Sequence, residues 1–342
     1  MVGPMAPPLR LGVVYDFRSP PGSDIPLQDV YARTIEQAVL VDRLGYDQIW
    51  FTEHHFLEDG HLPSFVPIAG AIAARTTNVR LSTDIALAPF YNPIRLAEDV
   101  AVLDLISGGR MELGLGMGYA PHEFAGFGIP VSRRVSLTEE LVQILRLAWS
   151  GERFTFRGKR YTYEDLLVTP TPVQPGGPPL WIAAMSEGGA HRAARFDTHL
   201  LPQGSREVVL DPWRADLVAS GRDPGNYRVG IIRSCLVTDD PERDWAAIKD
   251  GERYRMSVYG RFFNETKDRL TAFDRNVASI PQGWFVGTVE ECIAEFGAFI
   301  DEYGITDVVL WGVPPGVDPD RMTMSLERFA TEVAPALRAR RS

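Results

Sequence analysis

The chain of 342 residues is 45% hydrophobic and 23% charged, a composition typical of a folded globular protein. Its formal net charge is -10, and this acidic balance without a basic stripe argues against a nucleic-acid partner or an anionic membrane surface. The length fits either one large α/β barrel or two ordinary domains.

Cysteine usage and the N-terminus narrow the class of protein further. Cys235 and Cys292 are far apart in sequence and have no Cys or His at ligand spacing, so neither a disulfide framework nor a zinc site is supported. Both lie in apolar patterns and are expected to be buried thiols. Residues 1–8 lack a charged segment followed by an apolar core, and no run approaches the length of a membrane span. We therefore expect a soluble, cytoplasmic protein.

In the first half of the chain, strand-like segments alternate with segments of helical periodicity. Short apolar strands are expected at residues 9–15, 48–52, 79–86 and 112–117. Apolar positions at helical spacing predict helices at residues 31–44, 66–75, 92–106 and 137–148. Each strand is thus followed by a helix, which is the order of a parallel sheet built from βα units.

The alternation resumes in the second half after a break. Residues 151–173 are aromatic and contain Gly and Pro, and we expect an insertion there that carries a short hairpin. Strands are then expected at residues 180–184, 199–201, 227–237 and 306–311, and helices at residues 187–196, 206–220, 241–259, 289–300 and 322–337. No convincing period covers residues 261–282, so a second insertion is expected around residues 260–285.

Eight strands, each followed by a helix, predict an α/β fold with a single (β/α)₈ TIM barrel over residues 1–342. A doubly wound sheet is the alternative architecture. It needs a domain boundary, and no linker-like composition marks one.

The stretch from Gly45 to Phe56 carries the strongest chemical signal. Its apolar residues 49–51 lead directly into Glu53 and His54, the pattern of a buried parallel strand that delivers polar groups to the carboxyl end of a sheet. A purely structural imidazole is the competing interpretation. We predict that Glu53 and His54 are catalytic.

Two glycine-containing segments are candidates for holding an anion. Glycine occupies every second position from Gly114 to Gly118, which either lets a flat ligand approach the backbone or allows close strand packing. This spacing is not the dinucleotide fingerprint, because no helix opens immediately after it. The turn around Ser186 opens a helix, so its backbone N–H groups and hydroxyl suit a phosphate. Ser186 also fits a simple helix cap, and the two roles are compatible.

Several segments in order resemble the bacterial luciferase-like flavin monooxygenase family. They cover residues 44–47 with 53–56, 92–99, 103–110, 123–128, 179–184 with 192–195, and 286–292. The resemblance implies a barrel with insertions, usually dimeric, that binds reduced flavin at the carboxyl ends of its strands. It makes His54 the catalytic histidine beside the flavin and Glu53 the carboxylate that orients it.

The same resemblance implies a set of cofactor contacts. The end of the third strand is expected to pack under the flavin ring, often with a non-proline cis peptide, and the turn at Ser186 to bind the phosphate. The implied contacts are Thr83, Asp84, Ile85, Gly116, Met117, Gly118, Tyr119, Met185, Ser186, Glu187 and Gly188. Two positions depart from bacterial luciferase, because Met117 replaces a phosphate-binding arginine and Met185 replaces a carboxylate. The phosphate is then expected to rest on backbone N–H groups, Ser186, Tyr119 or a more remote arginine.

The implied reaction is a two-component monooxygenation. FMNH₂ from a separate NAD(P)H:flavin reductase binds, O₂ forms a C4a-peroxyflavin, and one oxygen atom passes to a small organic substrate. His54 is expected to control the protonation of the peroxide. An F420-dependent hydride-transfer oxidoreductase is the alternative, although that branch commonly shows Ser-Asp-His where this chain has Glu53, His54 and His55. A non-catalytic flavin-binding or partner-stabilising subunit is a further alternative. In each case a homodimer is expected.

The substrate is expected to be apolar or aromatic, because the candidate walls of its pocket are aromatic. No charged pocket stands out, and an aromatic lid is expected within residues 260–285. The expected walls are Tyr15, Phe17, Phe56 and Tyr119, with Phe262, Phe263 and Trp284 as the lid.

Overall fold

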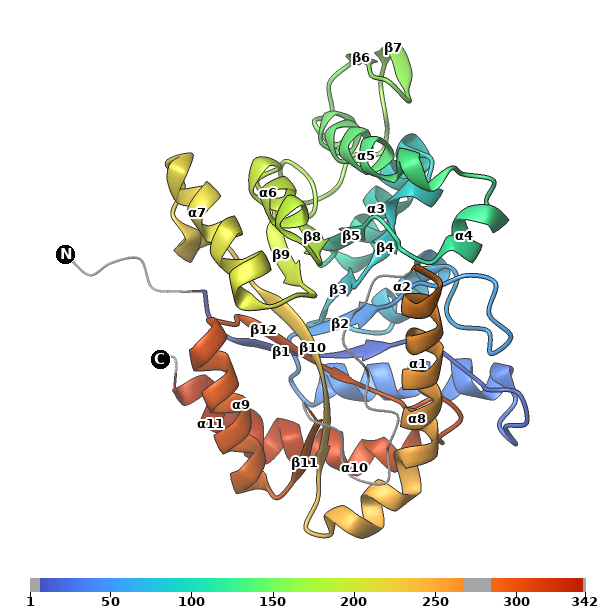
Figure 1. The fold of residues 1–342 in the computed structure, drawn as a ribbon, viewed down its shortest axis with the longest axis vertical. Helices are drawn as coiled ribbons and strands as arrows, with labels where there is room; N and C mark the ends of the chain where they lie inside the picture. The colour runs from blue at the N-terminus through green and yellow to red at the C-terminus, as the bar shows by residue number, and fades with distance from the viewer. Residues whose placement is uncertain (1–6, 267–283, 341–342) are drawn as a thin grey trace, which may run out of the picture. The chain divides into compact units, whose positions relative to one another are not determined.

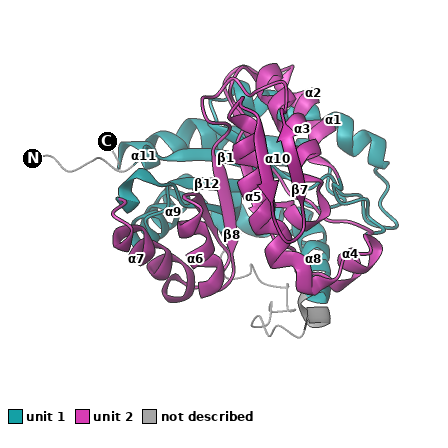
Figure 2. Cartoon of the chain, turned by 90° about the horizontal axis from the view of Figure 1, so that it is seen from above, with its two compact units in different colours: residues 1–50, 57–63, 223–342 teal, residues 51–56, 64–222 magenta. Residues whose placement is uncertain are grey.

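The computed structural model describes residues 7–266 and 284–340, and in that part the chain forms two compact units (Figure 2). The first unit contains residues 1–50, 57–63 and 223–342, and the second contains residues 51–56 and 64–222. Both units combine parallel strands with helices, so the predicted α/β class is confirmed. The single domain over residues 1–342 stays a prediction.

The first unit combines segments from the beginning and the end of the chain. Its elements are β1 (Arg10–Tyr15), α1 (Leu27–Arg43), β2 (Gln48–Phe51), η4 (Pro224–Asn226), β10 (Gly230–Val237), α8 (Pro241–Thr266), β11 (Trp284–Gly287), α9 (Val289–Tyr303), β12 (Asp307–Trp311), α10 (Asp320–Arg328), η5 (Phe329–Val333) and α11 (Ala334–Ala339). The last residue of β2 belongs to the second unit.

A sheet in the order β11-β10-β12-β1-β2 runs through the first unit. Strand β1 pairs in parallel with β12, while β10 pairs with β12 through residues 230–233 and with β11 through residues 234–237. Strand β11 was not predicted, because four residues next to a segment without periodicity give no alternation to detect. The four strands predicted in this unit are all present.

The expected second insertion, at residues 260–285, needs correction in the described part. Arg261 and the residues to Thr266 continue helix α8, because Val258 and the buried Phe262 extend its apolar stripe at a spacing of four residues. Trp284 is not a lid residue, since its ring lies 5.1 Å from that of Trp245 in a core cluster. The remaining lid positions lie outside the described residues, as does the side chain of Phe263.

The two cysteines are both buried, as predicted. Cys235 lies on β10 and Cys292 on α9, where the Cys292 thiol donates to the Gly287 carbonyl at 3.8 Å.

The second unit is a continuous block apart from the short segment at the end of β2. Its elements are α2 (Phe65–Ala73), β3 (Arg80–Thr83), β4 (Ala86–Leu87), η1 (Ala88–Phe90), α3 (Pro93–Ser107), β5 (Leu113–Gly116), α4 (Pro121–Gly126), η2 (Val131–Arg133), α5 (Arg134–Trp149), β6 (Phe154–Arg157), β7 (Thr162–Leu166), β8 (Leu180–Ala184), α6 (Glu187–Arg195), β9 (His199–Pro202), η3 (Arg206–Leu210) and α7 (Asp211–Ala219).

Strands β4, β5, β8 and β9 form a parallel sheet in that order, with α6 beside β8 (Figure 1). A parallel bridge between Leu81 and Met111 joins β3 to the start of the β5 segment. Because the strands are parallel, their carboxyl ends and the loops that follow lie along one edge. We call this the carboxyl edge of the second unit.

The predicted hairpin in the first insertion is confirmed, since β6 and β7 pair in an antiparallel ladder. Helix α4 was not predicted, because six residues are too few for a periodic stripe. Among the described residues, no helix combines the length and the apolar character needed to cross a membrane.

Candidate active site

His54 lies at the carboxyl edge, three residues after the end of β2. Its Nδ1 is 2.9 Å from Oε1 of Glu123 on α4, and that oxygen also accepts the backbone N–H of His55 at 2.9 Å. Glu123 is fully buried and the His54 side chain is 8% exposed. A carboxylate at Nδ1 holds the proton on that nitrogen, so Nε2 is the acceptor of the neutral ring. The pair is therefore built to fix the tautomer of His54.

The predicted role of Glu53 in orienting His54 is wrong. One oxygen of Glu53 lies 2.9 Å from Nε2 of His55, and the other accepts a hydrogen bond from the hydroxyl of Tyr91. Burial, with Glu53 as a second cause, raises the pKa of Tyr91 well above its ordinary value, so the phenol stays protonated and donates. Adjacent residues of an extended segment point in opposite directions, so Glu53 serves His55 and not its neighbour His54.

Aromatic rings surround His55 on the same edge. The rings of Phe90 and Phe127 meet its imidazole edge to face, with centroids 5.8 Å and 4.7 Å away, and stack on each other at 4.5 Å. Phe56 is 60% exposed, and its ring covers Gly126, where a Cβ atom would lie 2.2 Å from it. The histidine pair thus lies beside an apolar, ring-lined surface.

The end of β3 packs tightly against β5. The Thr83 hydroxyl donates to the carbonyl of Gly114 at 2.6 Å and accepts its N–H at 3.1 Å. A Cβ on Gly114 would lie 1.9 Å from the Thr83 carbonyl oxygen, and one on Gly116 would lie 1.7 Å from Cδ1 of Ile85. Of the two interpretations of these glycines, close packing therefore describes Gly114 and Gly116. The Asp84–Ile85 peptide is cis, as the resemblance implied.

Asp84 follows β3 and carries a buried carboxyl group. Its backbone N–H donates to the carbonyl of Phe51 at 2.8 Å, which ties it to the end of β2. Atom Oδ2 is buried without a hydrogen-bond partner in the described part of the chain. Burial raises the pKa of Asp84 to about 7.

The turn after β8 is open to solvent. Met185, Ser186, Glu187 and Gly188 are all exposed, and the Ser186 hydroxyl makes no capping hydrogen bond to helix α6. The first N–H groups of a helix have no intrahelical acceptor, so this end presents donors and a positive dipole. The simple-cap interpretation of Ser186 is therefore wrong, and an anion site fits the geometry.

The loop after β5 also belongs to the carboxyl edge and contacts both His54 and an arginine. Met117, Gly118 and Tyr119 are half-buried, and the Tyr119 ring meets His54 edge to face at 6.0 Å. The guanidinium of Arg134, at the start of α5, donates to the Gly118 carbonyl at 3.4 Å. An arginine therefore lies at this loop although position 117 lacks one.

Two expected wall residues lie in the first unit. Tyr15 and Phe17 are both buried, with ring centroids 6.0 Å apart, at the carboxyl end of β1. Their part in substrate binding stays a prediction.

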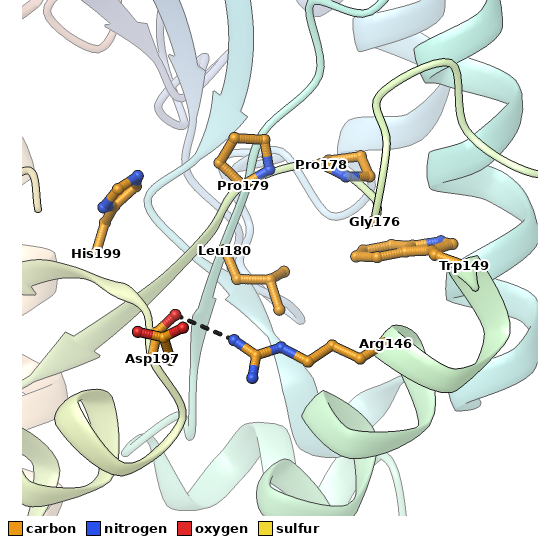
Figure 3. Close-up of a pocket in the computed structure, with 8 residues that line it drawn as sticks. All are labelled: Arg146, Trp149, Gly176, Pro178, Pro179, Leu180, Asp197 and His199. Carbon is orange, nitrogen blue, oxygen red and sulfur yellow. Dashed lines mark hydrogen bonds between the residues drawn. The ribbon is translucent and has the colours of Figure 1, made fainter. Parts of the chain in front are cut away.

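The second unit contains a cavity of about 180 Å³, and Figure 3 shows the residues that line it. Leu180 and His199 are the first residues of β8 and β9, so this cavity is at the amino ends of the strands. Arg146 there donates to the Asp197 carbonyl at 3.1 Å. The full lining is Arg146, Trp149, Gly176, Pro178, Pro179, Leu180, Asp197 and His199. Catalytic groups of such sheets lie at the carboxyl ends, so this cavity is not the active site.

Sequence patterns alone missed Glu123 and Tyr91 as site residues. Glu123 has a detectable signal, since Pro121 opens a helix and a carboxylate in its first turn is favourable there. Tyr91 directly precedes the Asn92 cap of α3, but nothing local indicates its bond to Glu53.

Comparison with known proteins agrees with this fold. The model of the Luciferase-like monooxygenase family matches residues 9–306. F420-dependent glucose-6-phosphate dehydrogenase of Kineococcus radiotolerans is 30% identical over 322 residues, which cover 88% of this chain and 91% of that protein. The oxygenase component of flavin-dependent trigonelline monooxygenase of Acinetobacter baylyi is 25% identical over 330 residues, 90% of each chain. The crystal structure of monooxygenase RslO1 from Streptomyces bottropensis superposes with a TM-score of 0.82 at 24% identity, covering 96% of this chain and 99% of that one.

The chain therefore belongs to the luciferase-like monooxygenase family and is an oxidoreductase of that family. Its structural neighbours confirm the predicted luciferase-like, TIM-barrel-like α/β scaffold. Its relatives divide between flavin monooxygenases and F420-dependent dehydrogenases.

Proposed function

We propose that the protein is the oxygenase of a two-component flavin monooxygenase. The observation that carries this proposal is the His54–Glu123 pair, in which a buried carboxylate 2.9 Å from Nδ1 fixes the tautomer of the imidazole. Bound reduced FMN supplies the electrons that reduce O₂, so that one oxygen atom enters the substrate and the other leaves as water. His54 holds and returns one proton at the reacting edge, and the aromatic rings around the adjacent His55 exclude water.

The residues of the carboxyl edge fit a phosphate-bearing flavin. The uncapped Ser186 hydroxyl and the start of helix α6 would hold the phosphate, with Arg134 as the cation that replaces the missing arginine at Met117. Thr83 and Ile85 would support the ring from β3. Gly188 leaves space for close approach, since a Cβ there would contact nothing within 4 Å.

We also propose a separate NAD(P)H:flavin reductase as the source of reduced FMN, and a homodimer as the working assembly. The trigonelline monooxygenase relative is described as an oxygenase component, which supports a two-component system. The rings of Phe56, Phe90 and Phe127 beside the histidines support a small apolar or aromatic substrate.

An F420-dependent dehydrogenase is the second candidate function. The 30% identity to F420-dependent glucose-6-phosphate dehydrogenase supports it. His54 would then transfer a proton to or from the substrate while hydride passes to or from the deazaflavin.

One experiment distinguishes the two candidates. The apo-protein is titrated anaerobically with reduced FMN and reduced F420, and the tighter complex is mixed with oxygenated buffer in a stopped-flow spectrometer. Tighter binding of reduced FMN, with a transient absorbance unlike either the reduced or the oxidised flavin, is expected. His54→Ala should keep FMN affinity and lose the transient, whereas His199→Ala, at the amino end of β9 and away from the candidate site, should keep both. Tighter binding of reduced F420 without an oxygen-dependent transient would instead support an F420-dependent dehydrogenase that transfers hydride.

A further inference from the structure

Asp84 has a position that the mechanism above does not use. Its N–H is tied to Phe51 at the end of β2, and the residues on both sides of it are fixed by β5. Thr83 is held by Gly114, and the Ile85 side chain fills the space above Gly116. The carboxyl group is therefore carried on a rigid backbone at the carboxyl edge, where the cofactor is proposed to lie.

The carboxyl group is buried without compensation. Asp84 is 8% exposed, and its Oδ2 has no hydrogen-bond partner among the residues that the structure describes. Because the buried Oδ2 of an ionised carboxylate would have no hydrogen-bond donor there, the charged form is disfavoured. With a pKa of about 7, the group is close to half ionised at neutral pH before any ligand binds.

The elements next to Asp84 carry other titratable side chains. The segment after β2 carries Glu53, His54 and His55. Tyr91 directly follows η1, and Glu123 lies on α4. Each of these has a partner within this group, since Glu123 bonds His54 and Glu53 bonds both His55 and Tyr91. Asp84 is not part of either set of hydrogen bonds.

We propose that Asp84 takes up a proton from solvent when the reduced cofactor binds, and that its neutral carboxylic acid then donates a hydrogen bond to an acceptor atom of the cofactor ring. This inference rests on the proposed binding of a phosphate-bearing reduced flavin or deazaflavin at the carboxyl edge. Such a ligand is anionic, and a like charge nearby disfavours the ionised form of Asp84. A buried acid kept neutral as a donor is an established device for stabilising charge on a ligand.

Calorimetry tests the proposal without any turnover. Reduced FMN and reduced F420 are titrated anaerobically into the apo-protein in two buffers of different ionisation enthalpy, at pH 6, 7 and 8. The difference between buffers gives the protons taken up per cofactor bound. The same titrations are run on Asp84→Asn and on the control Asp165→Asn, whose carboxylate is 74% exposed on the β7 strand.

In the wild type, Asp84 is expected to contribute about half a proton at pH 7, roughly a tenth at pH 6 and close to one at pH 8. Asp84→Asn should lose this contribution, and Asp165→Asn should keep it. Infrared difference spectra should also show a protonated carboxylic acid that appears on cofactor binding and is absent from Asp84→Asn. Equal proton uptake by wild type and Asp84→Asn at all three pH values would overturn the proposal. Tighter binding of F420 would refute the monooxygenase assignment instead, and proton uptake would then be read from the F420 titrations.

Discussion

The buried carboxyl of Asp84 makes a quantitative prediction about stability without cofactor. Its pKa is about 7 in the folded protein against an ordinary value of 3.8, with burial as the cause. The folded state thus binds more protons than the unfolded state between these values, so stability falls as pH rises through the window. The two pKa values differ by about three, and each pKa unit corresponds to ~1.4 kcal/mol. Above pH 7 the free energy of unfolding is therefore ~4 kcal/mol lower than it is below about pH 4.

Asp84→Asn replaces this carboxyl with a neutral group of the same shape. Its free energy of unfolding should match that of the wild type below about pH 4 and exceed it by a margin that grows by ~1.4 kcal/mol per pH unit up to pH 7. Urea unfolding of both apo-proteins at pH 5, 6, 7 and 8 measures this margin, with Asp165→Asn as the exposed control. A margin that stays constant from pH 5 to pH 8 would show that Asp84 is not desolvated, and the reasoning from burial would be wrong.

Three further predictions concern the site. Glu123→Gln should slow the oxygen reaction of the reduced-flavin complex by tenfold or more and shift its pH profile, whereas Glu53→Gln should affect it less; the reverse order would restore the role first expected of Glu53. Arg134→Met should weaken reduced-FMN binding by about tenfold, the loss of one charge-assisted phosphate contact, and anaerobic titration measures this; unchanged affinity would remove Arg134 from the phosphate site. Gly116→Ala should lower the free energy of unfolding by about 1–3 kcal/mol, because the added methyl group overpacks against Ile85. Adding Ile85→Ala to that variant should restore ~1 kcal/mol or more. Strictly additive effects of the two substitutions on the free energy of unfolding would argue against a contact between these residues.

Local pattern determined much of the fold. The eight predicted strands are all present, because apolar runs bounded by Gly and Pro mark buried parallel strands wherever they occur. The start of α3 could also be predicted, because Asn92 caps the helix and Pro93 is favoured at its first position, and both effects are confined to the first turn. Two elements escaped prediction, because α4 contains too few residues to show a helical period and the four residues of β11 adjoin a segment without periodicity.

The order of predicted elements along the sequence also indicated which segments reach the candidate site. His54 and Ser186 each follow a predicted strand directly, and parallel strands deliver their carboxyl ends to one edge. This inference needs only the order of elements along the chain.

Only the tertiary structure decided which side chains meet there. Glu123 lies 69 residues from His54, and Tyr91 lies 38 residues from Glu53, so no local spacing relates the members of either pair. Whether Glu53 or Glu123 holds His54 depends on the direction in which an extended segment turns each side chain, and on a short helix that brings a carboxylate to the imidazole. The unpartnered Oδ2 of Asp84 is likewise a property of its packed surroundings, because its burial and the lack of a donor arise only when Phe51, β3 and β5 are assembled within the second unit.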